Sequence, residues 1–495
     1  VLALGHDVVP TCIGCLVWLY KDGECPSRCQ QQLSNESTDS YNLSITDPTH
    51  LETEAKMAID ATTNTFRIII VGGGIAGLAT AIAMRGPQRE IIVLEKSRMN
   101  KEVGALLSLQ PNAQKIVEQW NLKDILQRAK PTAERQFRIL DTSGKIHMNI
   151  DMDGEKYGAD RMVYHRQDLH SALREAALST ELPGYPASIV TAAKVVSCDC
   201  ETGTITLEDN TTYQGDLIIG ADGIHSMVRE AVLKAGNHEL VHPAPTGVSA
   251  YRLLVETTNL ASLDVDKEVF DHTRQATTLI MGHDRRVIMG PARNGDLLGL
   301  VGMVPDEHMH ESSNPNSWTT PGHLSKLLQT YHDFPQWIRD IFKQAPDIAL
   351  WQLRDIDALP TWIAGRCIII GDAAHAMLPT QGQGASQSIE DAEALQAFFA
   401  DVTAKPDPQQ IAQRIRKVFE ARYKRASLIQ AYSRQQAKPA TEKGSVKVTL
   451  NPAEFLDYNC KYEGAVKWLE QQDASRRKLM AKRERMNTSS TGCSV

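Results

Sequence analysis

The segment from residue 66 to residue 95 constrains the fold more than any other part of the chain. It contains a β-branched run, Phe66–Val71, a glycine-rich turn, a helix-forming stretch from Leu78 to about Arg85, and a second apolar run, Ile91–Leu94. A continuous apolar run suits a strand that is buried on both faces of a parallel sheet. This order of elements predicts a βαβ unit within a doubly wound α/β domain.

Three glycines and one acid in this unit indicate a ligand. Gly72 allows the tight turn, Gly74 lets a pyrophosphate approach the backbone, and Gly77 lets the helix pack against the strand. The helix would begin at the phosphates, where its N–H groups and positive dipole end favour an anion. Glu95, at the end of the second strand, is placed to accept the hydroxyls of an adenosine ribose. We predict a dinucleotide site; the alternative is a packing turn without a ligand.

Two later blocks distinguish a flavin nucleotide from a nicotinamide nucleotide. In the first, a buried strand ends in Asp222-Gly223. In the second, a strand ends at Asp372, and a loop leads to a helix that starts near Gly384 and Ala385. An acid at a strand end suits a sugar hydroxyl, and amides at a helix start suit a developing negative charge.

Composition excludes several other classes of protein. The 495 residues are 42% hydrophobic and 23% charged, which is an ordinary globular balance. The net charge of -7 argues against nucleic acid as the main partner. No run approaches the roughly 18 apolar residues of a membrane span, so we expect a soluble, cytoplasmic protein.

Four cysteines near the start of the chain leave two interpretations open. Cys12, Cys15, Cys25 and Cys29 have the paired short spacings of a small zinc site. No secondary-structure pattern surrounds them, and Ser-, Thr-, Asn- and Asp-rich residues follow. We therefore favour a disordered extension or a misplaced gene start over a metal site.

The three blocks, in this order, resemble those of the flavoprotein aromatic hydroxylases, the group A FAD-dependent monooxygenases. The resemblance covers roughly residues 66–436 and is closest to the salicylate-hydroxylase-like enzymes of fungal aromatic catabolism and secondary metabolism. It implies FAD as cofactor, NAD(P)H as a transient co-substrate, and O2 as a reactant. It also implies hydroxylation of a phenolic or hydroxybenzoate-like compound through a flavin C4a-hydroperoxide. Oligomeric state and the choice between NADH and NADPH stay open.

The resemblance also implies a domain organisation, that of the p-hydroxybenzoate hydroxylase fold. Residues 66–240 and 365–436 would form a Rossmann-like FAD-binding domain. Residues 241–364 would form an inserted substrate-binding domain with a mixed or antiparallel sheet, covered by one helix over residues 323–345. Residues 1–65 would be a disordered extension. Residues 437–495 would be a C-terminal extension with a short helix around 463–472 and a basic tail.

The cofactor-binding residues can be carried over position by position. The resemblance implies that Glu95 contacts the adenosine ribose, Arg166 the pyrophosphate and Asp372 the ribityl chain. The backbone near Ser108 would pass the cofactor, and Asp222 and Gly223 would serve both FAD and the incoming nicotinamide nucleotide. Pro379 would form the wall beside the flavin ring, and Gly384 and Ala385 would contact the O2/N1 edge of the ring. The glycines Gly72, Gly74 and Gly77 would receive the phosphates.

The resemblance points to fewer catalytic residues than cofactor-binding residues. Arg252 matches an arginine that related phenol hydroxylases place near substrate and flavin, and a cation there would favour the ionised phenol. Tyr251 ranks second, because neighbours on a strand point to opposite faces and a buried tyrosine is more often core. The tyrosine that some relatives carry before a proline is Gly290 here, and a histidine of other relatives is Gly247. An indole or alkene oxygenase, or a non-catalytic flavin-binding module, are the alternatives.

Overall fold

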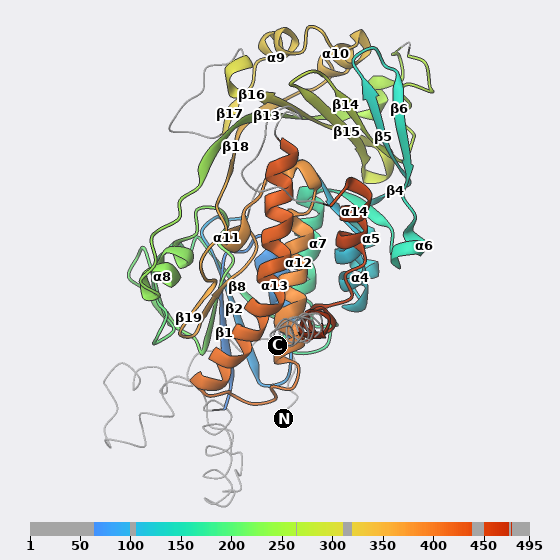
Figure 1. The fold of residues 1–495 in the computed structure, drawn as a ribbon. Helices are drawn as coiled ribbons and strands as arrows, with labels where there is room; N and C mark the ends of the chain where they lie inside the picture. The colour runs from blue at the N-terminus through green and yellow to red at the C-terminus, as the bar shows by residue number, and fades with distance from the viewer. Residues whose placement is uncertain are drawn as a thin grey trace, which may run out of the picture. The chain divides into compact units, whose positions relative to one another are not determined.

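The computed structural model describes residues 64–99, 105–263, 265–309, 319–437, 450–474 and 477. The four cysteines considered for zinc lie outside the described residues. Within the described part, two large β-sheets and the helices that cover them position the site (Figure 1).

The first large sheet contains the predicted βαβ unit and has six strands. Strand β1 pairs in parallel with β2 on one side and with β12 on the other, as the apolar runs predicted. The strand order is β19 (Ile363–Ala364), β20 (Cys367–Ile369), β12 (Leu217–Gly220), β1 (Phe66–Val71), β2 (Arg89–Glu95) and β8 (Ser188–Thr191). Only β19 runs antiparallel to its neighbour.

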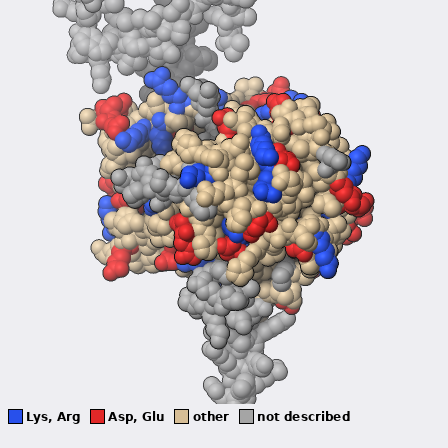
Figure 2. Space-filling model, turned by 90° about the horizontal axis from the view of Figure 1, so that it is seen from above, with Lys and Arg blue, Asp and Glu red and all other residues tan. Residues whose placement is uncertain are grey.

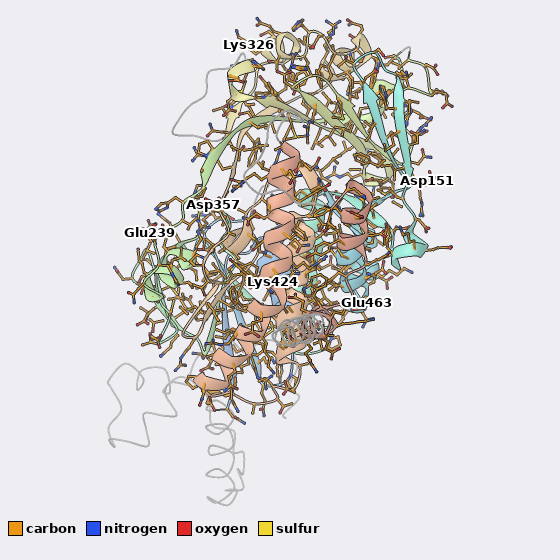
Figure 3. All side chains as sticks on the ribbon, in the orientation of Figure 1. Asp151, Glu239, Lys326, Asp357, Lys424 and Glu463 are labelled. Atoms are coloured by element: carbon orange, nitrogen blue, oxygen red, sulfur yellow. The ribbon has the colours of Figure 1, made fainter. Side chains whose placement is uncertain are left out.

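Helices cover this sheet and bury its apolar side chains. One large core cluster joins strand residues such as Ile68 and Ile70 to helix residues such as Leu78 and Leu395, all fully buried. The helices are α3 (Ile75–Ala83), α4 (Pro111–Gln119), α5 (Lys123–Arg128), α7 (Arg166–Leu178), α8 (Met227–Ala235), α12 (Gly384–Phe399) and α13 (Pro408–Ala437). The long α13 runs beside α12, and Lys424 marks it in Figure 3.

The second large sheet has eight strands and is mixed. All of its pairs are antiparallel except the parallel pair of β14 with β5. The order is β17 (Thr319–Pro321), β18 (Ile348–Asp355), β13 (Ala244–Glu256), β16 (Leu297–Pro305), β15 (Arg286–Ala292), β14 (Ala276–Met281), β5 (Gln136–Asp141) and β6 (Ile146–Asp151). The hairpin β5–β6, which the predicted boundaries place with the FAD-binding residues, extends this sheet.

One face of the eight-stranded sheet is covered by helices. The single helix predicted over residues 323–345 is wrong, because the structure has two, α9 (Leu324–Thr330) and α10 (Gln336–Phe342). Pro335 explains the break, since proline removes a helix N–H and disfavours helical backbone at the preceding residue. In Figure 3, Lys326 on α9 lies on the outer side of the sheet.

Smaller elements complete the described chain. A three-stranded sheet has the order β3 (Leu106–Leu109), β7 (Arg161–His165), β4 (Thr132–Glu134). A second has the order β11 (Thr212–Gln214), β10 (Thr204–Leu207), β9 (Val195–Asp199). Short helices are α6 (Gly154–Tyr157), α11 (Asp372–His375) and α14 (Pro452–Cys460), and residues 465–474 are also helical.

Acidic and basic side chains are interspersed on the face shown in Figure 2, without a broad patch of one sign among the coloured residues. Within the described ranges, every helix is too short or too polar to cross a membrane.

Candidate active site

The glycine turn between β1 and α3 has two packed positions and one open position. Gly72 has φ +105°, and a Cβ there would lie 2.3 Å from the Ala221 carbonyl oxygen. A Cβ on Gly77 would lie 1.9 Å from the Gly72 carbonyl oxygen. A Cβ on Gly74, by contrast, would meet no atom within 4 Å, and no side chain caps α3 at that residue. The helix N-terminus therefore faces open space, as a pyrophosphate would require.

Glu95 is held against this turn. Its Oε2 accepts a hydrogen bond from the Gly73 N–H at 2.7 Å, and its Oε1 accepts one from the Ser97 N–H at 2.7 Å. A carboxylate has about four acceptor positions, so both oxygens retain capacity for the hydroxyls of a ribose. The half-buried side chain thus lies where the sequence pattern placed it.

The Asp222-Gly223 block presents its backbone to the site. The Asp222 carboxylate accepts hydrogen bonds from the Met227 N–H at 2.8 Å and the Val228 N–H at 3.1 Å, and it also accepts one from Ser226. Burial raises the pKa of this carboxyl. Its main task is therefore to cap α8. Gly223 has φ +77° and open space beside its Cα, so the ligand-facing group here is the glycine backbone.

Asp372 and Arg166 come from distant segments, and Arg166 acts electrostatically on Asp372. Asp372 begins α11 directly after β20, and Arg166 begins α7. The Asp372 side chain is exposed to water. Desolvation by the surrounding protein nevertheless raises the pKa of its carboxyl group, and the charges of His375 and Arg166 oppose this rise. Asp372 thus follows the carboxyl end of β20, and the carboxyl ends of strands are where α/β proteins bind ligands.

The start of α12 is held by a buried polar network. Gln383 donates to Gln110 at 2.7 Å, and Gln110 donates to the Gln381 carbonyl at 2.6 Å. Gly384 has no atom within 4 Å of a Cβ position, and no side chain caps α12. Ala385 follows it and is half-buried. The first amides of α12 are therefore fixed in place and open to a ligand.

Ser108 and Pro379 flank this helix start. A Cβ on Gly382 would lie 3.1 Å from Ser108 Oγ, so strand β3 adjoins the loop before α12. Pro379 begins the short 3-10 helix η4 (Pro379–Gln381) and is exposed. Its neighbour Leu378 is buried against Ala250 of the eight-stranded sheet, so the loop links the two sheets.

A buried ion-pair network beneath α12 was not found from the sequence. Arg422 pairs with Glu390 and, at 2.9 Å, with Asp391, and Arg425 donates to Glu390 at 2.7 Å; all four side chains are fully buried. Asp391 also pairs with His375 at 2.7 Å, which gives this histidine a structural partner. Arg422 and Arg425 lie near the middle of α13, and no sequence motif marks them.

Arg252 lies on the inner face of the eight-stranded sheet. It is half-buried, and its guanidinium lies 4.5 Å from the ring centre of Trp351. Desolvation, and then repulsion by Arg166, lower its pKa to about 10, so it remains charged at neutral pH. Arg166 therefore acts electrostatically on both Arg252 and Asp372. Trp351 was missed in the sequence, because only the strand register places it beside Arg252.

Tyr251 lies on the opposite face. It is fully buried in the core that the sheet forms with α9 and α10, and its ring lies 6.3 Å from that of Tyr331. Along β13, Tyr251, Leu253 and Val255 are buried, whereas Arg252 and Leu254 are half-buried. Arg252 and Tyr251 therefore do not share a pocket, and the tyrosine occupies the packing position that its burial suggests.

Gly290, where the resemblance led us to expect a tyrosine, packs beside an apolar side chain. Gly290 pairs with Gly299 across β15 and β16. A Cβ on Gly299 would lie 2.2 Å from Leu106 Cγ, and one on Gly290 would lie 3.8 Å from Leu106 Cδ1. The two glycines thus make room for the apolar side chain of Leu106. Gly247 has φ +77° and open space beside it.

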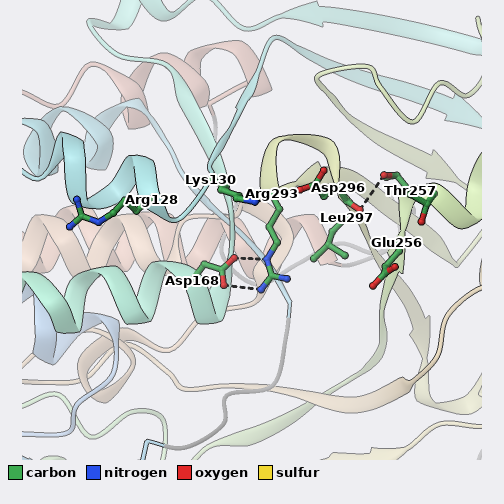
Figure 4. A pocket seen from close by; sticks show the side chains of 9 residues that line it. Arg128, Lys130, Asp168, Glu256, Thr257, Arg293, Asp296 and Leu297 are labelled. Atoms are coloured by element: carbon green, nitrogen blue, oxygen red, sulfur yellow. Dashed lines mark hydrogen bonds and ion pairs between the residues drawn. The ribbon is translucent and has the colours of Figure 1, made fainter.

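A pocket of about 520 Å³ lies farther from this site (Figure 4). Arg293 makes a bidentate pair with Asp168 at 2.6 and 2.9 Å, and Lys130 lies 3.9 Å from Asp296. Arg128, also in the lining, pairs with a glutamate. Because each cation in the lining has an acidic partner, the pocket does not attract a further anion strongly.

The fold and the site define a dinucleotide-binding α/β protein with a second sheet facing the nucleotide. A family model described as "FAD binding domain" matches residues 65–413. The chain is 30% identical to hispidin-3-hydroxylase of Neonothopanus nambi, over 75% of this chain and 89% of that one. It is also 30% identical to a salicylate hydroxylase of Pseudomonas putida, over 74% and 84%. The chain belongs to the FAD-dependent monooxygenases of the flavoprotein aromatic hydroxylase family.

Solved structures agree with this family. A substrate complex of salicylate hydroxylase matches with a TM-score of 0.64 and 26% identity, over 77% of this chain and 91% of that one. CtdE in complex with FAD and a substrate matches with a TM-score of 0.66 and 22% identity, over 84% and 100%, which supports the fold. The predicted family, fold class and FAD cofactor are confirmed.

Proposed function

We propose that this chain uses NAD(P)H and O2 to hydroxylate a phenolic or hydroxybenzoate-like aromatic compound. The observation that carries the proposal is the placement of Arg252, a desolvated cation on the inner face of the eight-stranded sheet, within electrostatic reach of Arg166. Two cations that repel each other across a site favour an anion between them. An ionised phenol is such an anion.

The cofactor fits the three open glycine positions. Gly74, Gly223 and Gly384 come from three distant segments, and each has open space where a side chain would stand. We assign the pyrophosphate to the turn at Gly74 and to Arg166, the adenosine ribose to Glu95, and the ribityl hydroxyls to Asp372. We assign the remaining FAD contacts to the backbone at Ser108 and Gly223, to Pro379 beside the flavin ring, and to the backbone amides of Gly384 and Ala385.

Bound FAD would supply the redox chemistry, accepting a hydride from the nicotinamide nucleotide and activating O2 for oxygen transfer. The protein residues have different tasks. The amides at the start of α12 stabilise negative charge that develops on the ligand beside them. Arg252 binds the substrate oxygen and lowers the pKa of the phenol, which makes the ring electron-rich. Trp351 holds the guanidinium by its ring face. We assign no catalytic role to Tyr251.

Leu106 favours a second candidate function. With Leu106 packed against Gly290 and Gly299, the face beside Arg252 has an apolar group where some relatives have a tyrosine. Such a face also suits an indole or an alkene, which needs no second phenol-binding group. The substrate would then be oxygenated without first losing a proton.

Substrate-stimulated consumption of NADH or NADPH tests these proposals. The purified protein is assayed with each nucleotide against hydroxybenzoates, polyketide phenols, indoles and alkenes, and oxygenated product and hydrogen peroxide are quantified. We expect strong stimulation by a phenol, with product formed in proportion to nucleotide consumed. Product from indoles or alkenes alone would favour the second candidate. Peroxide without product would indicate an oxidase, and no turnover would indicate a non-catalytic flavin module.

A further inference from the structure

Three cysteine side chains converge away from the flavin-facing surfaces. Cys198 lies on β9, Cys200 follows that strand, and Cys367 begins β20. Their sulfur atoms all lie within 4.8 Å of one another, and the sulfurs of Cys198 and Cys367 are 3.6 Å apart. Cys200 and Cys367 are buried, whereas Cys198 is half-buried. None of the three is part of a disulfide.

Backbone contacts, independent of the thiols, bring the two segments together. The Arg366 N–H donates to the Cys200 carbonyl at 2.8 Å. Gly365 has φ +50°, and a Cβ there would lie 2.4 Å from the same carbonyl oxygen. The close approach therefore requires glycine. Because the scaffold fixes both segments, the three sulfurs are already gathered before any ligand binds.

The ligand set selects one class of cation. Metal–sulfur bonds of about 2.3 Å place the sulfurs of a common ion roughly 3.8 Å apart, close to the separation of Cys198 and Cys367. Sulfur ligands without carboxylates or histidine favour thiophilic ions over Mg²⁺ or Ca²⁺. We propose that Cys198, Cys200 and Cys367 form a three-sulfur site for a thiophilic cation, specifically Zn²⁺, with a fourth position open to water on the half-buried Cys198 side.

A metal ion held by these three sulfurs would join two separate parts of the fold. The site would tie the small β9–β10–β11 sheet to β20, whose end leads into Asp372. Its role is to stabilise the fold, because a metal ion that binds the folded chain contributes its binding free energy to folding. It does not depend on the proposed reaction.

The test uses full-length, FAD-loaded protein in which Cys12, Cys15, Cys25 and Cys29 are serine, so that those thiols bind no metal. The reduced, metal-free protein is given Zn²⁺, excess ion is removed, and zinc is counted per chain. In parallel, Cd²⁺ is added and the ultraviolet cadmium–thiolate band is recorded. We expect about one zinc per chain, a cadmium–thiolate band, and a higher Tm with zinc than without it.

The single variants Cys198→Ala, Cys200→Ala and Cys367→Ala should each lose most of the zinc and the rise in Tm. Cys460→Ala is the matched control, since Cys460 is buried in α14 away from the cluster and should leave zinc binding unchanged. Retained FAD shows that a variant is folded. Cys198→Ala should disturb the fold least of the three variants, because Cys198 is only half-buried. Three results would overturn the proposal. The parent protein could fail to retain zinc, or Cys198→Ala could retain as much zinc as the parent. The third is a Cys198–Cys367 disulfide that re-forms in preference to metal binding.

Discussion

The two large sheets present different chemical groups to the site. The six-stranded sheet is mostly parallel and apolar, and in the proposed assignment it would contact the ligand at its strand ends, through glycine backbone and a few acids. The eight-stranded sheet is mixed, and in the same proposal it would contact the ligand through alternate side chains of one face, such as Arg252 and Trp351. Backbone recognition depends on glycine spacing, whereas recognition by a sheet face depends on strand register.

This difference separates what is common to the family from what is particular to this chain. A glycine position tolerates almost no change, because a Cβ collides with neighbouring backbone, as at Gly72, or occupies the space of the ligand, as at Gly74. We expect that a residue on the sheet face can be exchanged with less disturbance of the fold, because its side chain does not pack against neighbouring backbone in this way. The predictions below test whether the two regions separate in this way.

The largest expected effect is on the support of the flavin-facing helix. Arg422→Ala removes one of the two arginines that balance Glu390 and Asp391, which leaves one uncompensated negative charge in the buried network, so the free energy of unfolding should fall by roughly 3–5 kcal/mol. Denaturant titration measures this loss. Arg416→Ala is the matched control on the same helix, because Arg416 is exposed and its loss should cost about 1 kcal/mol or less. Equal losses in both variants would contradict the assigned role of the network.

Gly74→Val should separate cofactor binding from folding. The backbone at Gly74 has φ −75°, which any residue adopts, and its surroundings are open, so the apoprotein should keep its Tm. FAD affinity should fall about 100-fold, or ~2.8 kcal/mol, because the side chain enters the phosphate position. Gly72→Val should instead lower the Tm. Fluorescence titration with FAD measures the affinity, and unchanged binding by Gly74→Val would refute the assignment of the turn.

Arg252→Ala should affect the substrate and spare the cofactor. We expect FAD content to stay unchanged and kcat/KM for coupled hydroxylation of a phenol to fall roughly 10- to 100-fold, or about 1.4–2.8 kcal/mol. Arg252→Lys should restore part of this loss, because it keeps the charge without the planar guanidinium. Steady-state assays with product analysis measure both. Normal coupling in Arg252→Ala would remove Arg252 from the catalytic residues.

Trp351→Leu should have a smaller effect through the same arginine. Loss of the ring beneath the guanidinium removes about 0.5–1 kcal/mol of cation–π attraction, which corresponds to roughly a two- to fivefold change in kcat/KM. In the Arg252→Ala background the same change should have almost no further effect, since the two residues act as a unit. Fully additive losses would show that Trp351 acts independently of Arg252.

The last prediction concerns the pH dependence of stability and the C-terminal segment. Burial raises the pKa of Glu393 from 4.5 to about 7, and its carboxyl group accepts hydrogen bonds from the Ala465 N–H and the Tyr462 hydroxyl. Between these two pKa values the folded state binds more protons than the unfolded state, so stability falls as pH rises through this window. Glu393→Gln should flatten the corresponding change in Tm. An identical pH profile in the variant would exclude Glu393 as its source.

The comparison of the two sheets also explains which features could be predicted from the sequence. The βαβ unit and the positions of Glu95 and Gly74 were predictable, because glycine spacing and continuous apolar runs are local signals. The pairing of β5 with β14 was not, since register between distant strands leaves no local pattern. The cap formed by Asp222 and the burial of Arg422 were also missed for this reason. Each depends on partners that the sequence places far away or marks with no motif.

The most direct test of the account is the pKa of a hydroxybenzoate phenol bound to FAD-loaded protein, measured by ultraviolet absorption against pH. We predict that the wild type lowers the pKa of the bound phenol, and that Arg252→Ala binds the same compound without that shift. An equal shift in both proteins, or none in either while the wild type still hydroxylates the compound, would contradict the assignment of substrate recognition to the inner face of the eight-stranded sheet.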